Sequence, residues 1–182
     1  MSTVFTHTAP VLAAALALGG RRVPPRLLLF GIVCAVLPDV DVIGFRLGIA
    51  YGNIAGHRGL SHSLLFALML GAVGALLAPL LHTERKNAFL IGLFAGASHI
   101  LSDAMTDGGL GVAAFWPVDQ QRYFLAWRPV RVSPLGVRAL FSERGAAVLI
   151  SEFFWIWLPC LLGGGALFVL RHLLSRRGKN HA

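Results

Sequence analysis

Long apolar runs, separated by short polar segments, recur along the whole chain. The first run covers residues 4–20 and ends before Arg21-Arg22. The clearest run covers residues 64–81 and contains no charged side chain, and the last covers residues 147–170. Because a helix needs about 20 mostly apolar residues to cross a bilayer, this pattern predicts an all-α integral membrane protein.

Two further runs are less regular. Residues 27–37 are too few to cross a bilayer alone, so the helix either continues past Pro38 to Phe45 or breaks at Pro38-Asp39. Residues 88–101 lead into a polar stretch that we expect to stay helical until Gly108-Gly109. The sequence therefore predicts a helical bundle with four or five spans.

The remaining segments complete a single domain of residues 1–182. Residues 46–63 form a Gly-rich loop, and residues 110–146 are the longest stretch that does not span. Pro159 and a run of three glycines interrupt the last apolar run. The basic tail of residues 171–182 is expected to be flexible.

Composition supports the membrane interpretation. Hydrophobic residues make up 56% of the chain and charged residues 13%, which is far from the average of soluble domains. The net charge of +8 comes from basic residues beside apolar runs, so membrane topology explains it better than nucleic-acid binding does. We read Cys34 and Cys160, both inside apolar runs, as small buried hydrophobes.

The basic residues also suggest an orientation. No positive charge precedes the first apolar run, so we expect a retained helix with its N-terminus outside, not a cleaved signal peptide. Nine of the 16 basic residues then lie inside, mostly at helix ends, where the orientation rule counts most. The same topology brings most of the histidines and acids to the outer, periplasmic side of a bacterial inner (plasma) membrane: His7, Asp39, Asp41, His57, His62, His99, Asp103, Asp107 and Glu152.

This group of side chains suits a divalent metal. Residues 57–63 place two imidazoles directly before an apolar run, and His99, Asp103 and Asp107 would share one helix face. Imidazole and carboxylate ligands suit zinc first, and also manganese or iron. A bound cation would lower the pKa of a water and produce a hydroxide nucleophile. The candidates exceed one tetrahedral site, so one or two ions are expected, from His7, Asp39, His57, His62, His99 and Asp103.

Other side chains are candidates for catalysis and substrate binding. Arginine can hold a phosphate through two hydrogen bonds, and Arg128 and Arg131 rank ahead of Arg58 because aromatic residues surround them. The catalytic candidates are Asp41, Asp107 and Glu152, and the substrate-binding candidates are Arg58, Arg128, Arg131 and Trp116. Several of the candidate residues also have an ordinary structural explanation. His99 could be an interior histidine whose nitrogens are hydrogen-bonded within the protein, and the acids of Asp39-Val40-Asp41 could cap a helix. Asp103 and Asp107 could form ion pairs with outer arginines.

The order of several motifs resembles a known family. His7, Leu37-Pro38-Asp39-Val40-Asp41, His57-Arg58-Gly59 with Ser61-His62-Ser63, and Ser98-His99 with Ser102-Asp103 follow one another as in the YdjM-like membrane-bound metal-dependent hydrolases. Phe115-Trp116-Pro117 and residues 128–134 are similar to later segments of that family, so the resemblance covers nearly the whole chain. It implies a small inner-membrane hydrolase whose metal set is His7, Asp39, His57, His62, His99 and Asp103, with Asp41 as a further member. Asp107 and Glu152 rest on the spacing argument alone.

We therefore expect hydrolysis of a membrane-associated ester or phosphoester, such as a phospholipid, by a metal-activated water. The expected partners are the lipid bilayer and an anionic lipid or lipid-linked substrate, with no nucleic acid. Two alternatives stay open: a metal-binding or transport protein without hydrolysis, and a structural or partner-binding membrane protein. The sequence leaves the oligomeric state, the metal and the substrate open.

Overall fold

A computed structural model describes residues 1–134 and 140–180, with side chains described to Arg176. Over these residues the chain is helical apart from loops and two isolated β-bridges, Thr106 with Val130 and Val112 with Tyr123. The α-helices are α1 (Ala9–Leu18), α2 (Pro25–Val36), α3 (Ile43–Arg46), α4 (Leu64–Leu77), α5 (Arg85–Ala104), α6 (Glu143–Glu152) and α7 (Leu158–Asn180). Three 3-10 turns, η1 (Thr6–Thr8), η2 (Leu37–Val42) and η3 (Leu60–His62), and a π-helical turn, η5 (Phe153–Trp157), join them.

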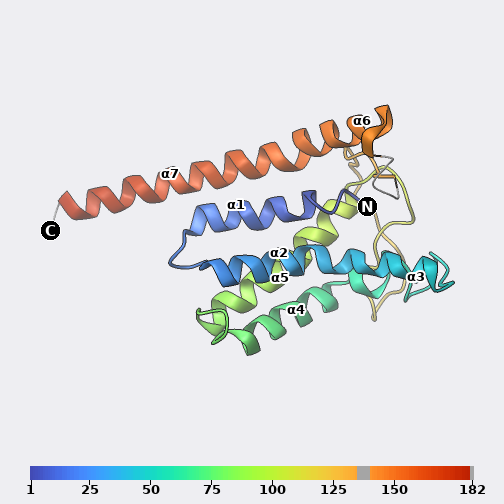
Figure 1. Ribbon diagram of the computed structural model, residues 1–182, viewed down its shortest axis with the longest axis horizontal. Coiled ribbons are helices and arrows are strands. Elements are labelled where there is room, and N and C mark those ends of the chain that lie inside the picture. The colour runs from blue at the N-terminus through green and yellow to red at the C-terminus, as the bar shows by residue number, and fades with distance from the viewer. Residues whose placement is uncertain (135–139, 181–182) are drawn as a thin grey trace.

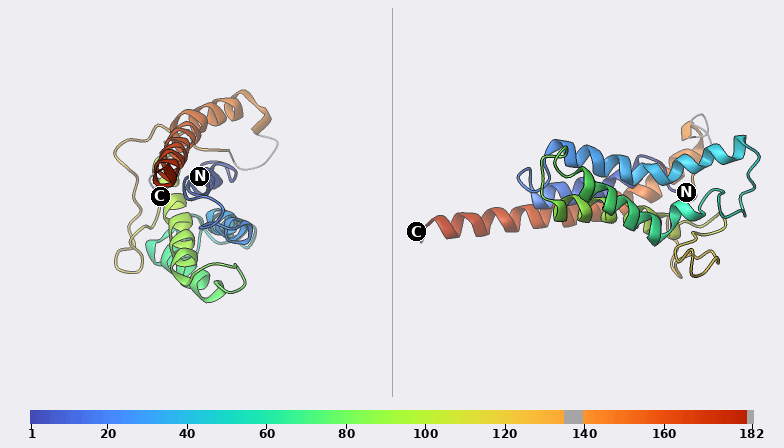
Figure 2. Two further views of the ribbon diagram at one scale, coloured as in Figure 1. Left: turned by 90° about the vertical axis from the view of Figure 1, so that its left-hand side faces the viewer. Right: turned by 90° about the horizontal axis from the view of Figure 1, so that it is seen from below.

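The long helices form an elongated bundle whose loops gather at its two ends (Figures 1 and 2). α4 packs along α5, α2 packs on α5, and α1 lies against α7. The α4–α5 contact is close because glycines line it: a Cβ on Gly92 would lie 2.6 Å from the Leu70 carbonyl oxygen. Such close contact between helices is typical of segments rich in Gly and Ala.

The helix that begins at Pro25 continues past Pro38. α2, η2 and α3 follow one another without a break, so Pro25–Arg46 forms one helical run. Pro38 falls in the first turn of the 3-10 segment, where its missing N–H is tolerated. Of the two alternatives for this segment, the continuous helix is correct. Asp39 and Asp41 both lie in η2, near the end of this run.

Two helices end earlier than predicted. α4 ends at Leu77, not near Leu81, since Pro79 cannot supply the N–H that would continue the ladder. α5 ends at Ala104, not at Gly108, because the Asp107 N–H, which would continue the helix by donating to the Asp103 carbonyl oxygen, donates instead to the Val130 carbonyl oxygen over 2.9 Å. The prediction that Asp107 continues the face of His99 and Asp103 is therefore wrong.

The last helix is more continuous than predicted. A helical path runs over Glu143–Arg176, and neither Pro159 nor the three glycines after it break the path. The π turn η5 lies just before Pro159 and changes the bonding pattern where a proline would interrupt an α-helix. Residues 171–180 are helical, and residues 181–182 of the predicted flexible tail lie outside the described residues.

By length and composition, two helical runs can cross a membrane: Pro25–Arg46 and Glu143–Arg176. Thr6–Leu18 and Leu64–Leu77 are apolar but shorter. Four or five spans are therefore not confirmed by helix length alone. The middle of the bundle is an apolar core that includes Val11, Cys34 and Leu70, and Cys34 is buried there as predicted.

Candidate metal centre

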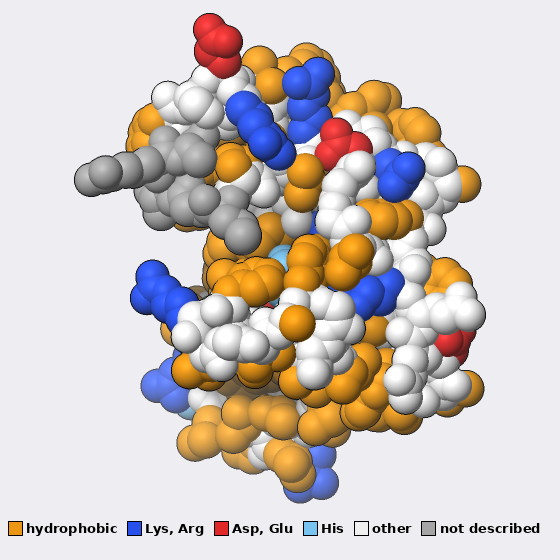
Figure 3. Space-filling model, turned by 90° about the vertical axis from the view of Figure 1, so that its right-hand side faces the viewer, with side chains coloured by type: hydrophobic (Ala, Val, Ile, Leu, Met, Phe, Trp, Pro, Cys, Tyr) orange, Lys and Arg blue, Asp and Glu red, His pale blue; other side chains and the backbone are white. Residues whose placement is uncertain are grey.

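The six predicted metal ligands converge at one end of the bundle. η1 carries His7, η2 carries Asp39, and α5 carries His99 and Asp103 near its last turn. All six side chains are buried: His7, Asp39, His57, His62, His99 and Asp103. Viewed onto this end, the surface is hollowed, and a histidine is visible at the bottom of the hollow (Figure 3).

Asp39 lies at the middle of this group and lacks hydrogen bonds. Both of its carboxylate oxygens are buried without a hydrogen-bond partner. The Nε2 atoms of three imidazoles surround them at 3.4 Å (His7), 3.6 Å (His99) and 3.7 Å (His62). These separations exceed normal hydrogen bonds. They match donor atoms that share one cation, because ligands about 2.0–2.1 Å from zinc lie roughly 3.3 Å from one another.

Neighbouring groups orient His99 and Asp103 toward the same point. His99 Nδ1 lies 2.7 Å from the Ala35 carbonyl oxygen, which leaves Nε2 facing the cluster, 3.0 Å from His62 Nε2. Asp103 Oδ2 accepts a 3.0 Å hydrogen bond from Arg58 Nε and lies 3.4 Å from His62 Nε2. The His7 and His99 rings stack with centroids 3.6 Å apart. The ligand candidates are therefore held in place by the fold.

The side chains form two overlapping groups that could each hold an ion. His7, Asp39, His99 and Asp103 offer ligand atoms within 4.8 Å of one another, and Asp39, His57 and His62 do the same. Asp39 belongs to both groups. The arrangement is therefore compatible with one ion or with two that share Asp39, as the sequence predicted.

Asp41 supports two of the histidines. His57 Nδ1 lies 2.6 Å from Asp41 Oδ1, and His62 Nδ1 lies 3.2 Å from Oδ2. The Ser61 hydroxyl also donates to Oδ2 over 2.6 Å. A carboxylate that holds the second nitrogen of an imidazole fixes its tautomer and orientation. Asp41 thus orients ligands in this structure, and its predicted catalytic role stays a prediction.

Arg58 lies inside the cluster and not at its entrance. Its side chain is 0% exposed, and its nitrogens donate to Asp103, to the Thr106 hydroxyl at 2.8 Å and to the Gly108 carbonyl oxygen at 3.0 Å. Its backbone has a positive φ of 62°. Next to it, a Cβ on Gly59 would lie 1.9 Å from the Ile54 carbonyl oxygen, so the tight loop requires glycine. A substrate contact by Arg58 does not fit this burial.

The remaining acids lie outside the two ligand groups. Asp107 is exposed, and its carboxylate accepts a 2.8 Å hydrogen bond from the Val132 N–H. Glu152 is buried, and Thr3 and Thr6 donate to its carboxylate. It thereby ties α6 to the N-terminal segment that carries His7. The geometry places neither acid among the metal candidates, and their catalytic roles stay untested.

The other substrate candidates lie on the surface of the same end. Arg128 is exposed, with its guanidinium 4.8 Å from the centre of the Phe124 ring. Arg131 is also exposed, and Trp116 is half-buried in a turn. Over the described part of the chain, neither arginine forms an ion pair with Asp107 or Glu152. The alternative that these outer arginines serve as ion-pair partners of buried or surface acids is therefore not supported.

Sequence analysis assigned no role to Arg122, which anchors the loop that carries His57. Its guanidinium donates to the carbonyl oxygens of His57 (2.8 Å), Tyr51 (2.9 Å) and Asn53 (2.9 Å). Burial lowers the pKa of Arg122 below its ordinary value. In the sequence, Arg122 lies between Asp119 and two aromatic residues, a pattern that is common at protein surfaces. Only the fold shows that the Arg122 side chain reaches the His57 loop.

The chain also has relatives among known proteins. Residues 1–174 match the family described as YdjM inner membrane protein. The protein named "Inner membrane protein YbcI" of Escherichia coli (strain K12) is 42% identical over 173 residues, which cover 92% of this chain and 98% of that protein. No solved structure matches the chain. These names agree on the inner membrane and state neither a metal nor a reaction.

Proposed function

The chain belongs to the YdjM inner membrane protein family, and on that premise we propose that it is a metal-dependent hydrolase of a membrane-associated ester or phosphoester. One observation carries the proposal: Asp39 keeps two buried carboxylate oxygens without hydrogen bonds while three imidazole nitrogens face them. An unsatisfied buried carboxylate is costly. A cation among these groups would remove that cost.

The charge of the buried cluster supports a divalent ion. Asp39, Asp41 and Asp103 each contribute a negative charge, and Arg58 is the cation that bonds to Asp103 among them. With neutral histidines, the three carboxylates carry more negative charge than Arg58 balances, and a divalent cation would offset this excess. The mixed imidazole and carboxylate donors favour zinc, with manganese or iron as alternatives.

The protein's own groups would prepare the site for chemistry. A bound zinc ion would supply Lewis-acid activation of a water molecule at neutral pH. Asp41 holds the imidazoles of His57 and His62, and Arg58 holds Asp103, so the donors need little rearrangement before they bind. Arg122 anchors the loop of His57 through three backbone carbonyl oxygens.

Elemental analysis of the detergent-purified chain tests the proposal, with wild type measured beside His62→Ala. We expect about one or two equivalents of a transition metal in the wild type and a large loss in the variant. His82→Ala is the matched control, since His82 lies at the α4–α5 turn and bonds to Arg26. A wild-type protein that is metal-free after purification and after zinc addition would contradict the proposal.

A transport function is less well supported. Transport would require polar groups between the cluster and the far end of the bundle. Among the described residues, the middle of the bundle is instead an apolar core that includes Val11, Cys34 and Leu70, and α4 contains no charged side chain.

A turnover assay distinguishes a metal-binding protein without hydrolytic activity. Such a protein would retain the metal and leave ester and phosphoester lipids intact.

We also propose that α1, α2, α4, α5 and α7 each cross the inner membrane, with the metal centre toward the periplasm. The N-terminus would then lie at the periplasmic end with the cluster, and α7 would end at the cytoplasmic face. In a background without Cys34 and Cys160, Gly52→Cys should react with an impermeant thiol reagent from outside. Lys86→Cys should react only after the membrane is opened. The reverse pattern would invert the protein and leave the metal site unchanged.

A further inference from the structure

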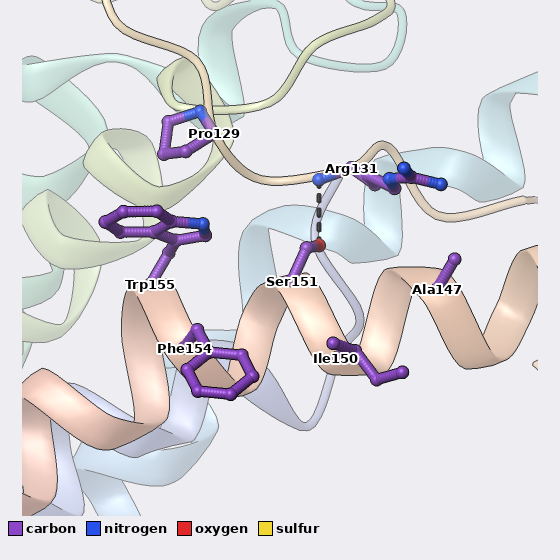
Figure 4. Close-up of a pocket in the computed structure, with 7 residues that line it drawn as sticks. All are labelled: Pro129, Arg131, Ala147, Ile150, Ser151, Phe154 and Trp155. Atoms are coloured by element: carbon purple, nitrogen blue, oxygen red, sulfur yellow. Dashed lines mark hydrogen bonds between the residues drawn. The ribbon is translucent and has the colours of Figure 1, made fainter.

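A groove lies on the outer side of α6 and η5, where the segment of Pro129 and Arg131 crosses them (Figure 4). Its volume is about 670 Å³. The Arg131 N–H donates to the Ser151 hydroxyl over 3.0 Å, which ties the loop segment to the helix. The residues that line most of it are Pro129, Arg131, Ile150, Ser151, Phe154 and Trp155.

One end of the groove is cationic. Arg131 also lines an adjoining pocket of about 360 Å³ together with Arg144 and Asp107. In the described chain no ion pair involves either arginine, and the Asp107 carboxylate takes the Val132 N–H. Two guanidinium groups thus face one acid, which leaves a positive site that fits an anion.

The other end of the groove is apolar and exposed. Ile150 is 58% exposed, Phe154 55% and Trp155 44%. These residues belong to the long apolar run Glu143–Arg176, which can cross a membrane. A free phosphate would leave this wall uncovered, whereas an acyl chain would cover it.

We propose that this groove binds an anionic glycerophospholipid, with its phosphate between Arg131 and Arg144 and an acyl chain along Ile150, Phe154 and Trp155. If the chain is the hydrolase proposed above, on which this step rests, the same class of lipid is its substrate. α6 connects the groove to the N-terminal segment: Ser151 lines the groove, and the next residue, Glu152, accepts hydrogen bonds from Thr3 and Thr6 in the segment that carries His7. Val130, between the two groove residues of the loop, is buried against Ala9 and Ile156.

The test measures lipid binding apart from turnover. The full chain in phosphatidylcholine nanodiscs is titrated with phosphatidylglycerol, and bound lipid is counted by native mass spectrometry. Arg131→Gln and Arg144→Gln should each weaken phosphatidylglycerol binding roughly tenfold, since each removes a charge-assisted hydrogen bond. Arg46→Gln removes an exposed charge at the same end of the bundle and should bind as the wild type does. Inorganic phosphate should not compete.

Three results would contradict the proposal that the groove binds this lipid. Equal binding of phosphatidylglycerol by wild type and both glutamine variants is the first, and loss of binding in Arg46→Gln to the same extent is the second. The third is a Phe154→Ser variant that binds the lipid as wild type does.

The same titration on His62→Ala separates this proposal from the metal proposal. Lipid binding that persists without metal supports the groove even if hydrolysis fails. A protein that holds metal and cleaves phosphatidylglycerol at the wild-type rate in both arginine variants would refute the groove as the substrate site.

Discussion

Charged side chains are buried at one end of the bundle and exposed at the other. At one end, Asp39, His99 and Asp103 are buried with ligand atoms within 4.8 Å of one another, and the buried Arg58 bonds to Asp103. At the other end, Arg21, Arg22, Lys86 and Arg171 are exposed. Arg21 and Arg22 line two pockets there, one together with Arg171 and the other with Lys86 and the acid Glu84. None of these four forms an ion pair in the described residues.

The difference shows which charges need a partner. Exposed cations at helix ends keep their water and can set membrane orientation without any specific contact. Buried carboxylates lose their water and need hydrogen bonds, a counter-charge or a metal. Asp103 accepts a hydrogen bond from Arg58, and Asp41 has hydroxyl, backbone and imidazole partners within hydrogen-bond distance. Asp39 accepts no hydrogen bond, although three imidazole nitrogens lie 3.4–3.7 Å from its oxygens. The comparison therefore identifies Asp39 as the position that a metal would complete.

The largest expected effect tests the charge balance of the buried end. Arg58→Ala removes the buried guanidinium that bonds to Asp103, Thr106 and Gly108 and should lower the free energy of unfolding by about 3–5 kcal/mol. Arg171→Gln, at the exposed end, should change it by no more than about 0.5 kcal/mol. Chemical denaturation in detergent measures both. Equal effects of the two substitutions would show that the ends do not differ in this way.

The second largest effect concerns metal affinity, which should depend on the buried end of the bundle and not on the exposed end. His99→Ala removes a candidate ligand and should lower metal affinity more than about 100-fold, beyond the effect expected for a supporting residue. His172→Ala, on α7 at the exposed end, should leave it unchanged. Competition with a chromophoric chelator measures the affinities. Wild-type affinity in His99→Ala would mean that the buried histidine is only a packed interior residue.

Asp41 should give an intermediate effect within the buried end. Asp41→Asn keeps the size of the side chain but weakens its hold on His57 and His62, so metal affinity should fall about 10- to 100-fold. The same chelator competition detects it, with Asp119→Asn in the surface loop as the control. A loss as large as that of His99→Ala would make Asp41 a ligand.

The smallest expected effect concerns the outer arginine of the groove. Arg131→Lys keeps the charge but loses the planar fork that binds a phosphate through two hydrogen bonds. Turnover of phosphatidylglycerol should fall several-fold, by roughly the value of one lost hydrogen bond, with metal content and unfolding unchanged. Arg22→Lys, at the exposed end, is the control. If Arg131→Lys lowers stability in proportion to turnover, Arg131 is a structural residue.

Much of the site could be predicted from the sequence because membrane spans alternate in direction. Polar segments after every second apolar run must meet at the same end, so His7, Asp39, the His57 loop and the end of α5 were expected together. The same pattern predicted the helices. These features depend on local composition and on the order of the runs, both of which are read directly from the chain.

Other features were decided only by the tertiary structure. The sequence could not show that α5 ends at Ala104, which removes Asp107 from the cluster. The Asp107 N–H donates to the Val130 carbonyl oxygen, which belongs to a segment far along the chain, and not to the helix. Arg58 and Arg131 are both arginines beside polar loops, yet one is fully buried and the other lines a surface groove. Their difference depends on which distant segments pack over them: Asp103 and Gly108 around Arg58, and α6 beneath Arg131. Hydrophobic patterning sets where a chain crosses the membrane, but the partner of each polar group is set by contacts between segments far apart in sequence.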